Sequence, residues 1–317
     1  MSFFHADKID RRAFLQTLPA LAAAVPVRQG VAEQAAHGEH RHASPSLPVW
    51  RRRGHIPVFD AHLHVPSGDD VHWQVHPVTP TVDQFVAYLE QCGVGRGIGN
   101  AVRSQVATSA AEMIAGNREM LRWRDRKPGH FVPACIVMPQ YLDESLRELE
   151  DWRKKYGAVW LGELCNYVSG FHYDTPGFAE IMKKVAELGM VIQIHANNDE
   201  MAHLVHTYPD ATMVFPHMGG GARFAQRVEL IASHRRSCLE IAASGHDTLG
   251  AIEYAVQKLG ADRVVFGSDF SINDPSGVVA VLDDALLPDR DKEKLFHANV
   301  ERLLKLAGYT FPARGAD

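Results

Sequence analysis

The chain has 317 residues, of which 46% are hydrophobic and 22% are charged. These values are those of an ordinary globular protein that can form one large domain with an extensive core. The formal net charge is −5, from 38 acidic and 33 basic residues. This mild acidity argues against a nucleic-acid partner, which would require a strongly basic face.

Residues 1–24 resemble a twin-arginine export signal. Arg11 and Arg12 are followed by Phe14, Leu15 and a short Ala- and Leu-rich segment, which is the order of such signals. Small residues near position 24 suit cleavage there, and the apolar segment is too short for a membrane span. We therefore predict a periplasmic protein exported by the twin-arginine route. The alternative is a basic tail on a cytoplasmic enzyme.

Residues 25–56 read as a polar linker. Three histidines, His37, His40 and His42, cluster in it, and a solvated tether is the simplest interpretation. No second domain and no transmembrane segment is predicted. The domain that carries the function is therefore expected to span residues 57–317.

The four cysteines do not form a metal or redox motif. They are scattered, with no Cys-x-x-Cys pair, which excludes a zinc ribbon or a thioredoxin-like site. Cys135, Cys165 and Cys238 lie in or beside apolar runs. We expect these three to be small buried hydrophobic residues.

From Pro57 onward, short β-branched runs alternate with amphipathic helical segments. The predicted strands are 58–64, 97–102, 131–138, 158–164, 191–195, 213–215, 238–242 and 264–270. Eight strands separated by helices predict an α/β fold, a single-domain (β/α)8 TIM barrel. A doubly wound open sheet is the alternative, but it would need a Gly-rich phosphate turn after its first strand. The sequence there is instead His-Leu-His-Val-Pro.

The helices between the strands carry recognisable ends. Thr81 and Gln84 predict a capping box for the helix over 81–91. Asp143 is expected to cap the next clear helix, and a short helix is expected near 117–123. Pro176 suits a first helical turn, and Gly189 is expected to end that helix. A last helix is predicted over 292–306.

The first strand carries two histidines on one face. Side chains alternate across a strand, so His62 and His64 point the same way as Val58 and Asp60. Imidazole is the commonest metal ligand in proteins. Two imidazoles that lie two residues apart on one face of a strand could therefore bind a single metal ion.

Four later strands also end in ligand-type residues. Glu163, His195, His217 and Asp269 each stand at the end of an apolar run. Taken singly, each has a simpler explanation, such as a satisfied core histidine, an ion pair or a helix cap. A TIM barrel, however, brings the carboxyl ends of its strands to one mouth. We therefore predict a shared metal site there.

These residues stand in motifs that resemble the amidohydrolase superfamily. The resemblance covers residues 57–307 and is greatest to its amidohydrolase-related branch of metal-dependent hydrolases and decarboxylases. The motifs are, in order, Asp-Ala-His-Leu-His (60–64), Gly-Glu-Leu (162–164), Ile-His-Ala-Asn (194–197), Pro-His-Met-Gly-Gly (216–220) and Gly-Ser-Asp-Phe (267–270).

The resemblance implies a divalent metal centre. His62, His64 and Asp269 would bind a first ion, while His195 and His217 would bind a second or complete a mononuclear site. Related enzymes place a bridging carboxylate where Glu163 stands, which favours two ions. Imidazole and carboxylate ligands suit zinc, our first expectation, and also manganese, iron or cobalt.

The predicted activity is that of a metal-dependent hydrolase. Metal-activated water would attack a small-molecule C–N, lactone or ester bond, and Asp269 would pass the proton of that water to the leaving group. The alternative is a metal-dependent nonoxidative decarboxylase of the same superfamily. Glu163 weakens that alternative, because the mononuclear decarboxylases generally lack a ligand on that strand. A non-catalytic metal-binding or interaction module is disfavoured by the complete ligand set.

Contacts to the small-molecule substrate are expected from the loops beyond the strands. The candidates are Trp73, Arg103, Tyr167 and Arg223. Either arginine could hold a substrate carboxylate through two parallel hydrogen bonds. No other partner is indicated, and homo-oligomer formation is left open.

Overall fold

The computed structural model describes residues 56–66, 79 and 81–311. The predicted signal, nearly all of the predicted linker, and Trp73 lie outside these residues, so the predictions made on them stay predictions. Within the described part of the chain, no helix is both long and apolar enough to cross a membrane.

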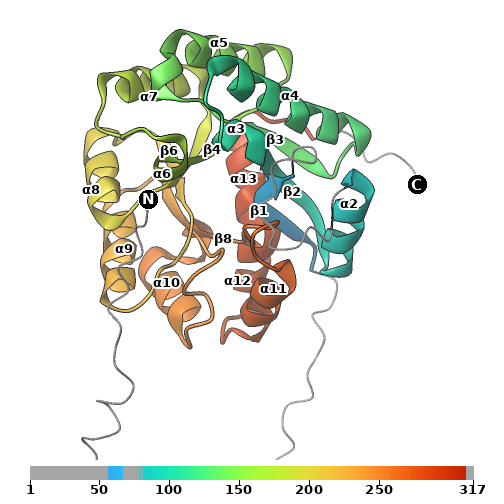
Figure 1. Ribbon diagram of the computed structural model, residues 1–317. Helices are drawn as coiled ribbons and strands as arrows, with labels where there is room; N and C mark the ends of the chain where they lie inside the picture. The colour runs from blue at the N-terminus through green and yellow to red at the C-terminus, as the bar shows by residue number, and fades with distance from the viewer. Residues whose placement is uncertain (1–55, 67–78, 80, 312–317) are drawn as a thin grey trace, which may run out of the picture. The chain divides into compact units, whose positions relative to one another are not determined.

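Eight parallel strands form one sheet in the chain order β1 to β8, with helices around them (Figure 1). An isolated parallel bridge between Leu63 and Phe270 brings the end of the sheet back to its beginning. The predicted TIM barrel is therefore confirmed. The strands are β1 (Val58–Val65), β2 (Val94–Ala101), β3 (Phe131–Cys135), β4 (Trp160–Cys165), β5 (Val191–His195), β6 (Thr212–Phe215), β7 (Ser237–Glu240) and β8 (Val264–Val265).

Helices connect successive strands, and the longer ones bury an apolar face against the barrel. The α-helices are α2 (Val82–Gln91), α3 (Val102–Gln105), α4 (Ala110–Arg126), α5 (Leu142–Lys155), α6 (Asn166–Ser169), α7 (Pro176–Leu188), α8 (Asn198–Thr207), α9 (Ala222–Ser233), α10 (Ala251–Leu259), α11 (Pro275–Asp284), α12 (Asp289–Glu293) and α13 (Asn299–Leu306). Short 3-10 turns cover Pro139–Tyr141 and Ala261–Arg263, and a π-helical turn covers Lys294–Ala298.

The structure confirms the helix ends that the sequence predicts for α2 and α7. Thr81 and Gln84 form the reciprocal capping box, and Thr175 caps α7 with Pro176 in its first turn. Gly189 ends α7 in the left-handed conformation, at φ 63°, which costs glycine little because it has no Cβ. These local signals fix where β5 begins, two residues later.

Two helix predictions need correction. Asp143 does not cap α5: Tyr141 occupies the N-cap position, and Asp143 lies in the first turn, where its charge suits the positive end of the helix dipole. The helix expected near 117–123 is α4, which starts earlier because the Ser109 side chain accepts a hydrogen bond from the Glu112 backbone N–H.

The end of the chain also departs from its prediction. The single helix expected over 292–306 is divided by the π-helical turn. Within that turn the Leu295 carbonyl accepts a hydrogen bond from the Phe266 backbone N–H at 2.9 Å. Asn299, at the start of α13, donates through its side-chain amide to the carbonyls of Ala261 and Val264. These hydrogen bonds hold the π-helical turn and α13 against residues 261–266, the segment that contains β8.

The barrel has two apolar layers. The larger cluster lies mostly between strands and helices and contains Phe85, Trp152 and Phe178, all fully buried. The smaller cluster combines side chains from all eight strands with Leu303 and Leu304 of α13. Cys135, Cys165 and Cys238 are buried as predicted, and no cysteine of the described residues is in a disulfide.

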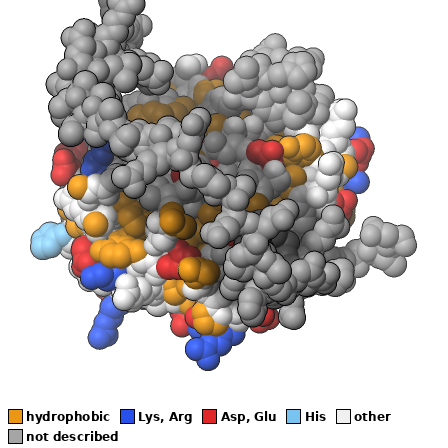
Figure 2. Space-filling model, turned by 90° about the horizontal axis from the view of Figure 1, so that it is seen from below, with side chains coloured by type: hydrophobic (Ala, Val, Ile, Leu, Met, Phe, Trp, Pro, Cys, Tyr) orange, Lys and Arg blue, Asp and Glu red, His pale blue; other side chains and the backbone are white. Residues whose placement is uncertain are grey.

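On the face shown in Figure 2, acidic and basic side chains lie interspersed around hydrophobic patches.

Candidate metal centre

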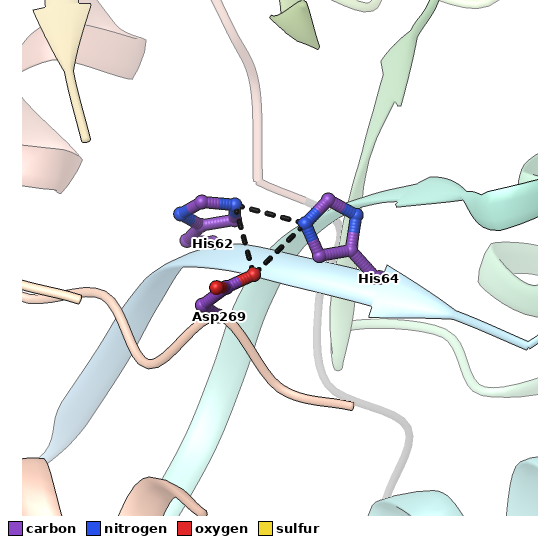
Figure 3. A group of neighbouring side chains, drawn as sticks. All are labelled: His62, His64 and Asp269. Carbon is purple, nitrogen blue, oxygen red and sulfur yellow. Dashed lines mark hydrogen bonds and ion pairs between the residues drawn. The ribbon is translucent and has the colours of Figure 1, made fainter. Parts of the chain in front are cut away.

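β1 and the segment after β8 bring three predicted ligands together. His62 and His64 project from the same strand, and Asp269 approaches them from the neighbouring segment (Figure 3). The Nε2 atoms of the two imidazoles are 3.0 Å apart. Asp269 Oδ1 lies 3.4 Å from His62 Nε2 and 3.0 Å from His64 Nε2. All three side chains are at least nine-tenths buried.

The backbone explains how Asp269 reaches this position. β8 is shorter than the predicted 264–270, because after Val265 the chain leaves the regular ladder. It stays beside β1 through hydrogen bonds from Ala61 N–H to the Phe266 carbonyl and from Asp269 N–H to the His62 carbonyl, both 3.0 Å. Asp269 has a φ of 64°, which is uncommon for a residue other than glycine and is often found at functional sites.

The spacing of these three atoms fits one divalent ion. Ligand atoms about 2.1 Å from a shared ion, at tetrahedral or octahedral angles, are roughly 3.0–3.4 Å apart. The three measured separations fall in that interval. Asp269 Oδ1 is also buried without a well-oriented hydrogen-bond donor among the described residues. An ion bound between the three side chains would satisfy this oxygen and both nitrogens.

Glu163 connects this group to the two remaining histidines. Its Oε2 lies 3.1 Å from His62 Nε2 and 3.5 Å from His64 Nε2. Its Oε1 lies 3.1 Å from His195 Nδ1 and 3.4 Å from His217 Nε2. Each oxygen therefore faces a different pair of imidazoles, which is what a carboxylate bridging two ions requires. The structure brings all six predicted ligands together.

A second layer of polar groups orients the imidazoles. Glu240 Oε2 lies 2.8 Å from His62 Nδ1 and accepts its N–H. Asn100 Oδ1 stands 3.3 Å from His64 Nδ1, and the Ala242 carbonyl stands 3.3 Å from His217 Nδ1. A proton held on Nδ1 leaves the Nε2 lone pair free to bind a metal. These contacts select the same tautomer in three of the four histidines.

The electrostatics are those of a tightly coupled cluster of acids and imidazoles. Burial favours the neutral form of Glu163, but His62, His195 and His217 outweigh burial and hold its pKa well below the usual range. Burial likewise opposes the charged form of His62, yet Glu163, Asp269 and Glu240 raise its pKa well above 6.5. The Glu163 carboxylate is thus ionised at neutral pH, as a metal ligand must be.

Three residues of the site were not predicted from the sequence as site residues. Glu240 ends β7 and is completely buried, and Asn100 stands near the end of β2. Cys165, expected only to fill space, places its Sγ 3.0 Å from Glu163 Oε2. Burial and the negative charge of Glu163 raise the pKa of this thiol well above 9. Glu240 had a usable signal, because it too is an acid within an apolar run.

The predicted substrate contacts are only partly placed at the mouth. A cavity of about 520 Å³ beside His195 is lined by Tyr167, Phe171 and His172. The Tyr167 ring meets His195 edge to face, with centroids 4.9 Å apart, and is 69% exposed. Arg103 and Arg223 are exposed side chains of α3 and α9 and do not line this cavity. Their predicted roles stay predictions.

The model of the amidohydrolase family matches residues 59–306, which is well over half of the chain and includes every element of the site. The chain belongs to the amidohydrolase family. Comparison of this amidohydrolase with curated protein sequences gives no match.

Solved structures with similar folds include several decarboxylases. The 5-carboxyvanillate decarboxylase from Sphingomonas paucimobilis is 14% identical, with a TM-score of 0.63, covering 79% of this chain and 99% of that one. The 2,6-dihydroxybenzoate decarboxylase from Rhizobium is 15% identical, with a TM-score of 0.62, covering 80% and 99%. A dihydroxybenzoic acid decarboxylase from Polaromonas sp. JS666, with bound manganese and the inhibitor 2-nitroresorcinol, is 15% identical, with a TM-score of 0.65, covering 79% and 97%.

At these identities the similarity establishes the shared fold. Together with the family match and the convergence of His62, His64 and Asp269, it supports a divalent metal site in this amidohydrolase.

Proposed function

We propose that this amidohydrolase is a metal-dependent nonoxidative decarboxylase acting on a small aromatic carboxylic acid. The observation that carries the proposal is the similarity along nearly the whole length of solved decarboxylases of hydroxylated benzoates, combined with a complete ligand set at the barrel mouth. This reverses the order of the two activities predicted from the sequence.

His62, His64 and Asp269 would hold the first ion, and His195 and His217 would hold a second, with Glu163 between them. A bound divalent ion supplies Lewis acidity that withdraws electrons from a coordinated substrate oxygen. We propose that the physiological metal is either manganese or zinc. A similar decarboxylase has bound manganese, and neither ion requires a thiolate ligand.

Decarboxylation breaks the bond between the ring and the carboxylate carbon, releases carbon dioxide and forms a new C–H bond. One proton must therefore reach the ring carbon, and we assign its transfer to Asp269. Burial opposes ionisation of Asp269, but His62 and His64 outweigh burial and lower its pKa. The resting carboxylate is thus ionised, so it takes a proton from solvent before passing it on. Its other oxygen, Oδ2, is held by Asn273 Nδ2 at 2.9 Å.

The substrate would enter through the cavity beside His195. Its lining by Tyr167, Phe171 and His172 offers aromatic surfaces against which a ring can stack. The volume of about 520 Å³ is within the range of small-molecule sites.

Hydrolysis is a second candidate activity because of the contacts that Glu163 makes. The Glu163 carboxylate faces separate imidazole pairs through its two oxygens, and two-ion sites of this kind are suited to activating water. In such a reaction Asp269 would take a proton from water rather than deliver one to carbon.

Product analysis distinguishes the two activities. The manganese- and zinc-loaded proteins are incubated with a panel of hydroxylated benzoates in ¹⁸O-labelled water. Decarboxylation predicts one carbon dioxide for each substrate consumed and no ¹⁸O in the aromatic product. Lactones and amides of the same acids are tested in parallel. Turnover of these compounds with incorporation of ¹⁸O, and none of the free acids, would establish hydrolysis instead.

A further inference from the structure

A second cavity lies at the opposite end of the barrel from the metal centre. It has a volume of about 490 Å³. Its lining includes Val191 and Thr212, the first residues of β5 and β6, whereas His195 ends β5 and His217 follows β6. Because a strand rises about 3.3 Å per residue, β5 alone separates the two sites by about 13 Å. Leu303 of α13 and Ala307, the residue that follows this helix, also line the cavity.

The cavity concentrates positive charge in an otherwise acidic protein. Four arginines line it, namely Arg235, Arg236, Arg263 and Arg302, and Asp210 is its single acidic residue. None of the four forms an ion pair with a carboxylate of the described residues, and Asp210 pairs with none of them. The chain as a whole carries a net charge of −5. The cavity therefore has a local excess of guanidinium groups that have no carboxylate partner among the described residues.

Two of these guanidinium groups are held in position by neutral partners. Arg263 donates to the backbone carbonyls of Leu259, Ile231 and His234. Arg302 donates to the backbone carbonyl of Asp262 at 2.6 Å. Carbonyl partners fix the orientation of a guanidinium group but leave its positive charge uncompensated. Such pre-oriented cations lose little entropy when an anion binds.

Arg235 and Arg236 also line the cavity, and most of their N–H donors have no partner among the described residues. Both are exposed. Arg236 has one hydrogen bond, from Nε to Thr212 Oγ1 at 3.3 Å, which leaves its terminal nitrogens available. Arg235 makes no hydrogen bond or ion pair with any described residue. The guanidinium fork matches the oxygens of a carboxylate or a phosphate group.

The remaining walls are apolar. Met190, Val191, Leu303 and Leu306 line the cavity, and so does the buried thiol of Cys238. Burial raises the pKa of this thiol to about 11, against the opposing effect of the charges on Arg302 and Arg263. The thiol is therefore neutral at physiological pH and does not compensate the charge of the arginines. The lining thus combines groups that suit an anion with apolar groups that suit a hydrocarbon or a ring.

We infer that this cavity is a second ligand site, separate from the metal centre, which binds a small organic anion carrying one phosphate or carboxylate group and an apolar portion. The inference does not depend on the activity proposed for the metal centre, because it uses none of the residues of that site.

Binding of two probes to the metal-loaded protein tests the inference. Phenyl phosphate and benzoate are titrated by calorimetry, which distinguishes a phosphate from a carboxylate ligand, and benzyl alcohol serves as the uncharged comparison. Binding of at least one anion is expected, with no binding of the alcohol. The double variant Arg235→Gln/Arg236→Gln should weaken binding by about tenfold or more, because two charge-assisted contacts are lost. Raising the salt concentration should weaken binding as well.

The control is Arg122→Gln, which removes an exposed arginine of α4 that is paired with Glu119, and its binding should equal that of the wild type. Hydrogen exchange locates the ligand: slower exchange is expected at 210–212 and 235–238. Equal affinity of the double variant and the wild type would overturn the inference, as would protection confined to 166–172 and 195–200. Absence of binding of both anions would show a solvated basic surface and would overturn it equally.

Discussion

Glu240 and His62 are joined by a hydrogen bond of 2.8 Å that is completely buried. The same carboxylate accepts the backbone N–H of Ala242 through Oε1, so its position is fixed from both sides. The bond holds a proton on His62 Nδ1 and directs Nε2 toward Asp269 and Glu163. Glu240 would therefore act on a bound metal through His62, as a positioning residue.

Glu240→Gln should weaken metal binding without abolishing it. The amide has the shape of the carboxylate but lacks its charge, so the His62 ring is held less firmly and is less basic. Loss of such a supporting contact typically costs about 10- to 100-fold in metal affinity. Competition with a chelating dye measures the dissociation constant. Glu229→Gln, an exposed acid on α9, is the control. Equal affinities for the Glu240 variant and the wild type would remove Glu240 from the site.

Glu163→Gln should change the number of ions rather than only their affinity. We expect about two ions per wild-type chain, because each oxygen of Glu163 faces its own pair of imidazoles. An amide offers only one oxygen and cannot bridge, so about one ion should remain. Metal analysis of protein purified without a polyhistidine tag measures this ratio. The Glu240 variant, loaded at saturating metal, should keep the wild-type ratio. One ion in the wild type would exclude the bridge.

Much of this centre could be predicted from the sequence because each ligand lies near the carboxyl end of a strand or in the segment that follows it. His195 illustrates this, since the glycine that ends α7 and the apolar run after it fix the bounds of β5. Parallel strands of a barrel all present their carboxyl ends at one mouth. Local signals for strand ends were therefore enough to predict which side chains meet.

The supporting residues could not be predicted in the same way. Asn100 belongs to β2, a strand with three glycines that is placed by its neighbours rather than by its own propensity. The contact between Cys165 and Glu163 depends on how β4 turns at its end, and a buried cysteine in an apolar run gives no sign of it. The position of Asp269 depends on the irregular hydrogen bonds to β1, which involve residues about 200 positions apart.

Asp269→Asn should abolish most of the turnover while the protein stays folded. Asparagine keeps an oxygen for the metal and the shape of the side chain, but it cannot accept and deliver a proton. Loss of a proton-transferring group typically lowers kcat by about 10²- to 10⁴-fold. Rates are compared at saturating metal, with metal content measured for each sample, so that a lost ion is not mistaken for lost proton transfer. Asn273→Ala, which only releases Oδ2 of Asp269, should have a smaller effect. Normal turnover of the Asp269 variant would refute the assigned role.

His234, far from the metal ligands, should make folding stability depend on pH. The imidazole is 4% exposed; Nε2 donates to the Tyr208 carbonyl at 3.2 Å, so Nδ1 accepts from the Ser237 hydroxyl at 2.7 Å. Burial lowers its pKa below 6.5, and the charges of Arg236 and Arg263 add to this effect. The unfolded chain therefore binds a proton at a higher pH than the folded protein does. Stability from this group is complete above pH 6.5 and is lost as pH falls from 6.5 toward the lowered pKa.

His234→Gln should remove this part of the pH dependence, because glutamine does not titrate. Urea unfolding of both proteins between pH 5 and 8 gives the difference in unfolding free energy at each pH. Titration of the metal centre contributes equally to both proteins and cancels in that difference. The stability of the wild type should fall more steeply below pH 6.5 than that of the variant. Ser237→Ala should lie between the two, because it removes the hydroxyl that favours the neutral ring. If unfolding free energy depended on pH in the same way for the wild type and His234→Gln, the imidazole would have the same proton affinity in the folded and unfolded states.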